Sequence, residues 1–452
     1  MNILTTKILE STKQFNRLLI VALFGLGVGL AAVPGGNSAG KYPQFPGTRT
    51  AFAFSTMKHM TPQQAEELNS HQVITVHLPG QLQLPHMSLP LLRANTSAQL
   101  LSPNAVKKVY NLTGGNGGSG TIAIVDADND LTAEADLGTF STMYHLPACT
   151  TANGCFTKYL DTSSPDGTAV STASDAVNGP ENQMETTLDI EWAHAIAPNA
   201  KILLVEEPDL SDFTYGVVYA SAQSGVVAVS LSLGGPEVVA ETSADPIFTA
   251  QNGGHIAYFA ASGDCGYIAC GGSSQGPSYP ATSPNVISVG GTTLGLKYDG
   301  SVRTESAWGY QVGTDWVGTG GGLSAYETEP SYQTTYNIPN ASGKRGTPDV
   351  SLVSDTNTGF PIYTSTTFAG HPEDTGWLAI GGTSAATPIW AAISTMVSGG
   401  LTNTKIYHDA KATPSILRDI TLGQNGPCGA LCNASVGYDY ATGLGVPNTL
   451  HL

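Results

Sequence analysis

Basic side chains are scarce in this sequence. Only 18 of its 452 residues are Lys or Arg, against 35 Asp and Glu, which gives a formal charge of −17 at pH 7. Such a chain lacks the basic surface with which proteins neutralise phosphates, and this argues against a nucleic-acid partner. Charged residues make up 12%, about half the usual share, while apolar residues reach 41%. The chain can therefore bury a large core, and a surface with few basic groups suits an acidic medium.

Long apolar runs are missing except near the N-terminus. Lys7, Lys13 and Arg17 precede an uncharged stretch, Leu18–Val33. A basic start, an apolar middle and small residues after it are typical of an export signal. This run of 16 residues is shorter than the roughly 20 that a membrane span needs. We expect residues 1–36 to be a signal peptide, with an N-terminal anchor as the alternative, and no other contact with a membrane.

Cysteine is also sparse, with six residues and no C-x-x-C motif. The six fall into close pairs along the chain: Cys149/Cys155, Cys265/Cys270 and Cys428/Cys432. In an exported chain this pattern favours three local disulfides. A zinc site is the alternative, but the spacings lack the regularity of tetrahedral zinc motifs.

Short apolar runs alternate with helical patterns from Ser102 onward. This alternation predicts an α/β fold, with a doubly wound, mostly parallel sheet and helices on both faces. The expected strands are Thr121–Asp126, Lys201–Val205, Val226–Ser232, His255–Ala261 and Val286–Val289, and the expected helices are Met184–Ile196, Phe213–Ser224 and Ala244–Gly253. Residues 37–101 are rich in Pro, Gln, Leu and Thr without such a pattern, so we expect a short pro-region or N-terminal extension before a domain at 102–452.

A glycine turn before an apolar helix is the strongest local signal for catalysis. The stretch Gly381–Pro388 reads GGTSAATP and runs into IWAAISTMV. It places Ser384 in the first turn of a helix, where free N–H groups and the helix dipole favour negative charge. A nucleophile is one interpretation, and a serine that only caps the helix is the other.

A nucleophilic serine needs a base, and the sequence has no HGTH-like element to supply a histidine. Glu185 and Asp189 stand four residues apart in a helical pattern and share one face. Two acids at this distance compete for protons, so one of them can act as a base where histidine is already protonated. Solvated helix acids are the alternative, and a neutral-pH hydrolase that uses His194 or His255 is a further one.

A third candidate follows the expected strand that ends at Ala261. Asp264 lies in the sequence SGDCG, at the carboxyl end of that strand, where ligand sites of such sheets lie. It can be a plain turn residue. When protonated in acid, it can instead donate a hydrogen bond to a developing oxyanion.

These three elements, in this order, resemble the sedolisin family of serine-carboxyl peptidases, which have a subtilisin-like fold and work in acid. The resemblance runs from about Ser102 to the C-terminus. It implies that Ser384 is the nucleophile, Glu185 its general base and acid, Asp189 the partner of Glu185, and Asp264 the oxyanion stabiliser. Three further segments look like family segments: Gly320–Ser324, Pro330–Gln333 and Arg345–Val350.

The same resemblance extends to a calcium loop at about residues 419–445. It implies one structural Ca²⁺ ion held by hard oxygen ligands, with carboxylates from two aspartates and main-chain oxygens from three other residues. The implied ligands are Asp419, Ile420, Ser435, Gly437 and Asp439, where Ser435 replaces a glycine typical of the family.

The chain departs from the family in two respects. Where relatives such as kumamolisin extend the acid chain with a glutamate and a tryptophan, this sequence has Asp126 and Leu233. The pro-region is also much shorter than the family's. We expect a secreted monomer that acts on polypeptides in acid, as an endopeptidase or a tripeptidyl-peptidase. A catalytically silent binding protein on the same fold is the alternative.

Overall fold

The structure is a computed structural model that describes residues 49–50, 58–71, 73–77, 97–161, 180–297, 299–366 and 375–451. The expected signal or anchor at residues 1–36 lies outside these residues. Within the described ranges, no helix is both long and apolar enough to cross a membrane.

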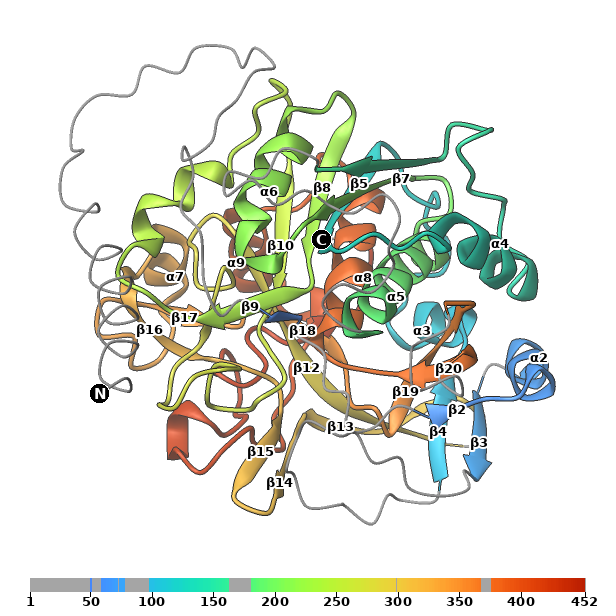
Figure 1. Ribbon diagram of the computed structural model, residues 1–452. Coiled ribbons are helices and arrows are strands. Elements are labelled where there is room, and N and C mark those ends of the chain that lie inside the picture. Colours follow the sequence, from blue (N-terminus) through green and yellow to red (C-terminus); the bar gives the residue numbers. More distant parts are fainter. Residues whose placement is uncertain are drawn as a thin grey trace, which may run out of the picture. The chain divides into compact units, whose positions relative to one another are not determined.

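A mostly parallel sheet forms the centre of the fold (Figure 1). Only β13 runs antiparallel to its neighbour, and β18 pairs with the long strand β12 outside the main order. The order across the sheet is β13 (Val302–Ala307), β12 (Ile287–Leu296), β10 (Ala257–Ala261), β8 (Val226–Leu231), β5 (Thr121–Ala127), β7 (Lys201–Glu207) and β6 (Phe156–Leu160), with β18 at Val350–Val353.

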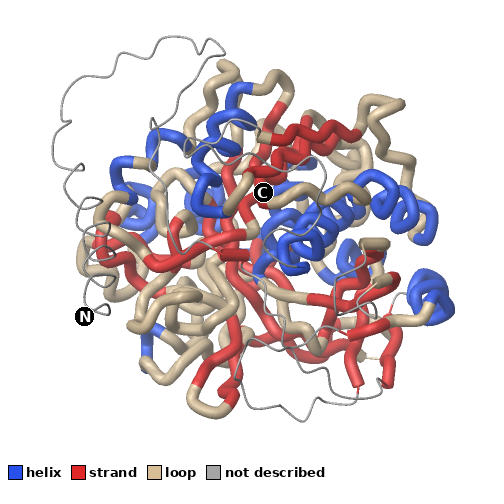
Figure 2. The backbone as a smooth tube through the Cα atoms, viewed as in Figure 1, coloured by secondary structure: helices blue, strands red, loops and turns tan. Residues whose placement is uncertain are grey.

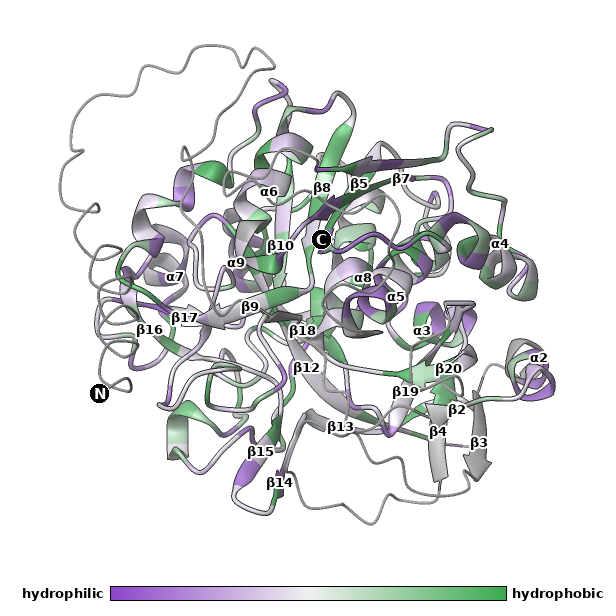
Figure 3. Cartoon of the chain, viewed as in Figure 1, coloured by the Kyte–Doolittle hydropathy of each residue, from purple (hydrophilic) through white to green (hydrophobic). Residues whose placement is uncertain are grey.

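Alternating side chains of these strands enter two separate cores. In β5, Ile122 and Ile124 join the core under α5 (Pro180–Ile196) and α8 (Thr383–Met396), whereas Ala123 and Val125 join the core under α6 (Phe213–Ala222). A strand covered on both faces is apolar at every position, which explains the continuous runs of the sequence. Figure 3 shows this apolar character along β8. The expected doubly wound α/β fold is therefore confirmed.

A five-stranded sheet brings part of the N-terminal region onto the catalytic half of the chain. Strand β4 pairs in parallel with β19, and β2 pairs antiparallel with β20. Its order is β2 (Lys58–His59), β20 (Gly376–Ile380), β19 (Thr358–Thr364), β4 (Ser97–Leu101) and β3 (Val73–His77). Strand β20 leads directly into the glycine turn before α8, so this sheet supports the segment that carries Ser384.

Smaller elements complete the fold (Figure 2). The other helices are α2 (Pro62–His71), α3 (Pro103–Val109), α4 (Ala133–Met143), α7 (Ser331–Tyr336) and α9 (Asn403–Ala412), with 3₁₀ turns at Leu210–Asp212, Glu241–Ser243, Asp245–Ile247, Pro414–Ile416 and Gly429–Leu431. The short strands are β1 (Arg49–Thr50), β9 (Leu233–Pro236), β11 (Ser278–Tyr279), β14 (Gly309–Val312), β15 (Asp315–Gly318), β16 (Gly322–Thr328), β17 (Lys344–Thr347), β21 (Leu417–Arg418) and β22 (Val446–Pro447).

One expected helix is wrong. The stretch Ala244–Gly253 forms only the 3₁₀ turn Asp245–Ile247, and Phe248 already leaves helical geometry with ψ 50°. The ring of Phe248 packs against Tyr258 and Tyr279 in the core instead. Asn252, Gly253 and Gly254 then follow, and glycines stabilise helices poorly. The three local disulfides are confirmed.

Candidate active site

Helix α5 carries both expected acids on one buried face. Pro180 occupies its first position, which suits proline because the N–H there has no helical partner. Glu185 and Asp189 are one turn apart and neither is exposed to solvent. The hydroxyl of Ser232, which follows β8, donates to Asp189 Oδ2 at 2.6 Å. This bond fixes the Asp189 carboxyl at the carboxyl end of the sheet.

The two carboxyls compete for protons. Burial is the largest cause that raises the pKa of each above its usual range, and the negative charges around each add to the effect. The interaction between the two side chains itself lowers the pKa of Glu185 and raises that of Asp189. These opposite directions favour Glu185 as the member of the pair that ionises first, which is the form that can act as a base.

Ser384 reaches the same place from the other side. Gly382 precedes α8 with φ 124°, a conformation that side chains rarely adopt. A Cβ on Gly381 would lie only 2.5 Å from the carbonyl oxygen of Ser354. The turn therefore requires both glycines, and it delivers Ser384 to the second position of α8. Ser384 is among the causes that lower the pKa of Glu185, so the two side chains lie near each other.

Asp264 completes the constellation. It follows Gly263, whose φ of 101° turns the chain sharply after β10. Its Oδ1 atom accepts hydrogen bonds from both the N–H and the hydroxyl of Thr383, each at 2.8 Å. The charge of Asp264 is also among the causes that raise the pKa of Glu185. The structure thus brings all four expected residues, from α5, the end of β10 and α8, into one buried cluster.

Comparison with known proteins agrees with this arrangement. The subtilase family model matches residues 165–422, more than half of the chain. Sedolisin from Pseudomonas sp. (strain 101) is 32% identical over 68% of this chain, and kumamolisin from Bacillus sp. (strain MN-32) is 32% identical over 61%. The chain belongs to the subtilase family, among the sedolisin-type serine-carboxyl peptidases.

A solved structure gives the same result. Pseudomonas sedolisin, a serine-carboxyl proteinase complexed with two molecules of pseudo-iodotyrostatin, superposes with a TM-score of 0.64 at 28% identity. The match covers 77% of this chain and 95% of that one. In contrast, the chain spans about half the length of the curated relatives, 54% of sedolisin and 50% of kumamolisin.

Neither candidate histidine of the neutral-pH alternative contacts this sedolisin-like cluster. His194 lies nine residues beyond Glu185 on α5, about 13 Å along the axis. It is buried, and its Nε2 atom pairs with the carbonyl of Pro147 at 2.8 Å. His255 precedes β10 and so lies at the amino end of that strand, whereas Asp264 follows its carboxyl end. The His255 ring pairs with the carbonyl of Leu401. The geometry therefore favours the carboxylate base.

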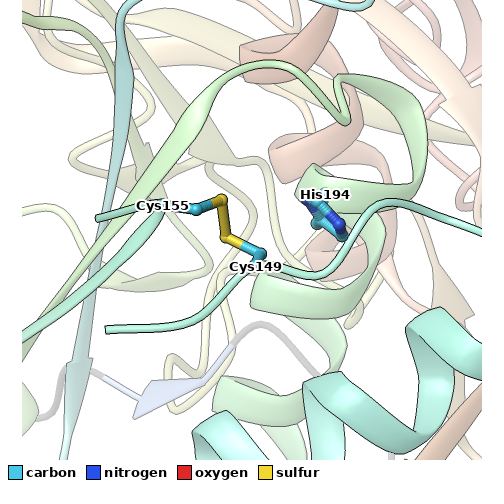
Figure 4. Close-up of side chains that lie close together, drawn as sticks. All are labelled: Cys149, Cys155 and His194. Atoms are coloured by element: carbon cyan, nitrogen blue, oxygen red, sulfur yellow. A yellow bond between two sulfur atoms is a disulfide. The ribbon is translucent and has the colours of Figure 1, made fainter. Parts of the chain in front are cut away.

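His194 lies instead beside the disulfide of Cys149 and Cys155 (Figure 4). Among the described residues, these three form the one cluster of His, Cys, Asp and Glu side chains compact enough to hold a metal ion. The sulfurs are bonded to each other, however, and a disulfide offers no thiolate ligands. The zinc alternative for this pair is therefore wrong in the oxidised protein.

The shortened acid chain is visible at Asp126. This residue ends β5, and burial raises its pKa to about 7. Its negative charge in turn raises the pKa values of Glu185 and Asp189, while its side chain interacts with Thr186. Leu233 is fully buried in the opposite core. Asp126 thus acts on the acid pair through charge, and Leu233 offers no polar group to extend it.

The C-terminal loop gathers the expected calcium ligands. The N–H of Gly437 donates to Asp419 Oδ2 at 2.8 Å, and the N–H of Ser435 donates to Asp439 Oδ2 at 2.9 Å. Asp419 also bonds the N–H of Ile420. Carboxylate and main-chain oxygens, the implied donors of these residues, are the hard ligands that Ca²⁺ selects. The residues present therefore fit this ion.

Two polar residues of the cluster were missed as functional candidates from the sequence. Ser232 binds Asp189 and also donates to the carbonyl of Ser384 at 3.3 Å, and Thr383 binds Asp264. Ser232 follows a parallel strand at its carboxyl end, where ligand sites concentrate, and that position was the available signal. Thr383 precedes Ser384, and nothing in the sequence pairs it with Asp264, 119 residues away.

Proposed function

We propose that this protein is a secreted, acid-acting serine-carboxyl peptidase that hydrolyses peptide bonds through an acyl-enzyme on Ser384. The observation that carries the proposal is the buried Glu185–Asp189 pair beside Ser384, in which the interaction between the two carboxyls lowers the pKa of Glu185 and raises that of Asp189. The sedolisin-type relatives support peptidase chemistry, and tripeptidyl-peptidase 1 from Dictyostelium discoideum, 29% identical over 61% of this chain, supports an exopeptidase mode as one form of it.

In the proposed reaction, Glu185 takes the proton of the Ser384 hydroxyl while the oxygen attacks the substrate carbonyl. The carbonyl oxygen becomes an oxyanion, and protonated Asp264 donates a hydrogen bond to it. Glu185 then returns the proton to the leaving amine, and the acyl-enzyme forms. Water attacks the ester with Glu185 again as base, which releases the acid product and restores Ser384.

Acid is required at one point in this cycle. An ionised Asp264 would repel the oxyanion instead of stabilising it. A histidine base would be protonated at pH 3–5 and could not accept the serine proton. A carboxylate base is therefore the base that works at the acid pH at which Asp264 is protonated. The low content of Lys and Arg limits charge repulsion within the protein at that pH.

The N-terminal segment supports a pro-region in this proposal. Strand β1, Arg49–Thr50, pairs antiparallel with Leu233 and Gly234 of β9, immediately after Ser232. Ser384 is fully buried in this state. We propose that residues 37–101 form a pro-region or N-terminal extension and that residues 102–452 form the peptidase domain. N-terminal sequencing of the exported protein tests these boundaries, and an N-terminus that stays at residue 1 would contradict both signal and pro-region.

We also propose one structural Ca²⁺ ion, held by Asp419 and Asp439 with the carbonyls of Ile420, Ser435 and Gly437. The ion would join two segments of the C-terminal loop that are 15 to 20 residues apart in sequence. The expected role is stability, since no ligand residue belongs to the Ser384 cluster.

Removal of calcium should lower thermal stability. An ion that binds only the folded state at 100 times its Kd contributes about 2.7 kcal/mol. We expect the unfolding midpoint to fall by several degrees in chelator and to return when CaCl₂ is added, as followed by calorimetry. Asp419→Asn should abolish the response to calcium, and Asp315→Asn, an exposed control, should keep it. A midpoint that is unchanged in chelator would contradict the calcium site.

The proposed activity is tested by digesting a peptide library at acid pH and identifying the products by mass spectrometry. Internal cleavage would establish an endopeptidase, and release of tripeptides from free N-termini would establish a tripeptidyl-peptidase. Intact peptides after incubation with correctly processed protein would instead support the silent binding protein.

A further inference from the structure

Two hydrogen bonds converge on a single oxygen of Asp264. The N–H and the hydroxyl of Thr383 both lie 2.8 Å from Asp264 Oδ1. Thr383 is fully buried and Asp264 is 3% exposed, so water does not compete for these bonds. The arrangement joins the first residue of α8 to the turn after β10, directly beside Ser384.

A third residue supports this direction of the hydroxyl bond. The N–H of Gly263 donates to Thr383 Oγ1 at 3.2 Å and occupies one of the two acceptor positions of that oxygen. The single hydroxyl proton of Thr383 is then available for Asp264. Hydrogen bonds therefore run from Gly263 through Thr383 to Asp264 Oδ1.

This pattern decides which oxygen of Asp264 carries a proton. A carboxyl oxygen has two lone-pair positions, and two donors already point at Oδ1. A proton on Oδ1 would face these donors and lose at least one of the bonds. In the acid form of Asp264, Oδ1 is accordingly the carbonyl oxygen and Oδ2 carries the proton.

We propose that Thr383 is a positioning residue, which fixes the acid proton of Asp264 on Oδ2 so that this atom donates to the oxyanion. This inference rests on the proposed function, in which Asp264 stabilises the oxyanion. Without the Thr383 hydroxyl, the acid group would lose one of the bonds that hold its orientation. In a fraction of the molecules its O–H would then point away from the reacting carbonyl. Preorganised donors of this type contribute to the rate because they need no rearrangement during the reaction.

Thr383→Val tests the inference, because it keeps the size and branching of the side chain and removes only the hydroxyl. We expect kcat at acid pH to fall by about tenfold or more, since removal of a whole oxyanion donor costs about 10²–10³. KM should change less than about threefold. The alkaline limb of the kcat profile should move to higher pH, because loss of a donor to the carboxylate favours the protonated form.

Two further variants separate this role from a structural one. Thr383→Ser keeps the hydroxyl, and its kcat should stay within about threefold of the wild type. Thr387→Val is the matched control, because the hydroxyl of Thr387 is equally buried in α8 but donates only to the carbonyl of Thr383. Its kcat and pH profile should resemble those of the wild type.

A kcat of Thr383→Val within twofold of the wild type would overturn the inference. So would a Thr383→Ser variant as impaired as Thr383→Val, since that result would make the methyl group decisive. If Thr383→Val does not fold, Thr383→Ala removes the same hydroxyl and carries the same expectation. Failure of the proposed function is distinct, because it would appear as full activity of Ser384→Ala whatever the Thr383 variants do.

Discussion

Ser384→Ala is expected to abolish peptide hydrolysis at acid pH, with a loss of at least about 10⁴-fold in kcat. The variant keeps the oxyanion donors but has no hydroxyl to attack the substrate carbonyl. Because Ser384 Oγ is buried and has no hydrogen-bond partner among the described residues, its removal should leave the fold intact. The measurement is release of peptides from casein at pH 3–5, with circular dichroism to confirm folding.

Glu185→Gln extends this prediction to the base. The amide has the same size but accepts no proton, so kcat should fall by about 10²–10⁴-fold. Glu191→Gln is the matched control, since Glu191 is also buried on α5 and also has a raised pKa, but it bonds the N–H of Tyr363 away from Ser384. Wild-type rates in Ser384→Ala or in Glu185→Gln would rule out the proposed mechanism.

Stability should fall steeply as the pH rises from acid to neutral. Several buried carboxyls outside the catalytic cluster have raised pKa values, mainly because of burial: about 8 for Glu206, about 9 for Glu241 and about 8 for Glu327. In the unfolded chain such groups titrate near 4. At a pH between the unfolded pKa and the folded pKa, the folded state still holds protons that the unfolded state has released. For each such proton, the free energy of unfolding falls by about 1.4 kcal/mol for every unit by which the pH rises.

Two of these groups form carboxyl–carboxyl pairs next to β9 and β16. After burial, the neighbouring carboxyl of Glu237 is the next cause that raises the pKa of Glu241, and Glu237 accepts bonds from the Ser324 hydroxyl and the Ala325 N–H. Asp245 raises the pKa of Glu327 in the same way. Ionisation of Glu241 or Glu327 would add a negative charge beside a second carboxyl in a buried site, which is unfavourable.

We expect the thermal midpoint to drop by about 10 °C or more between pH 5 and pH 8, which corresponds to a net loss of about 5 kcal/mol. Calorimetry across this range measures the slope. Glu241→Gln keeps a hydrogen-bond donor without a titrating proton and should flatten it, whereas Asp315→Asn, at an exposed carboxyl of the proposed peptidase domain, should leave it unchanged. A midpoint that is constant or rises toward pH 8 would contradict the prediction.

The sequence allowed the doubly wound sheet and the candidate catalytic residues to be predicted for physical reasons. Strands covered on both faces are apolar throughout, as in Ile122–Val125, and a nucleophile at a helix start needs glycines before it. Glu185 and Asp189 could be paired because the helical repeat places residues four apart on one face. Each of these inferences depends on residues that are close in sequence.

Features that depend on distant contacts could not be predicted. The bond of Thr383 to Asp264 and that of Ser232 to Asp189 join segments 119 and 43 residues apart. The pairing of β4 with β19 gave no periodic pattern, because these strands match through backbone hydrogen bonds. The expected helix at Ala244–Gly253 failed because tertiary packing of Phe248 outweighed local propensity.

The pH–rate profile of the purified, processed protein on a peptide substrate tests the central claim most directly. A carboxylate base with a protonated Asp264 predicts a bell-shaped profile of kcat/KM, with its maximum at acid pH and a clear loss of rate by pH 7. A rate that rises through pH 6–7 and stays high above it would identify a histidine base, and it would contradict the serine-carboxyl mechanism.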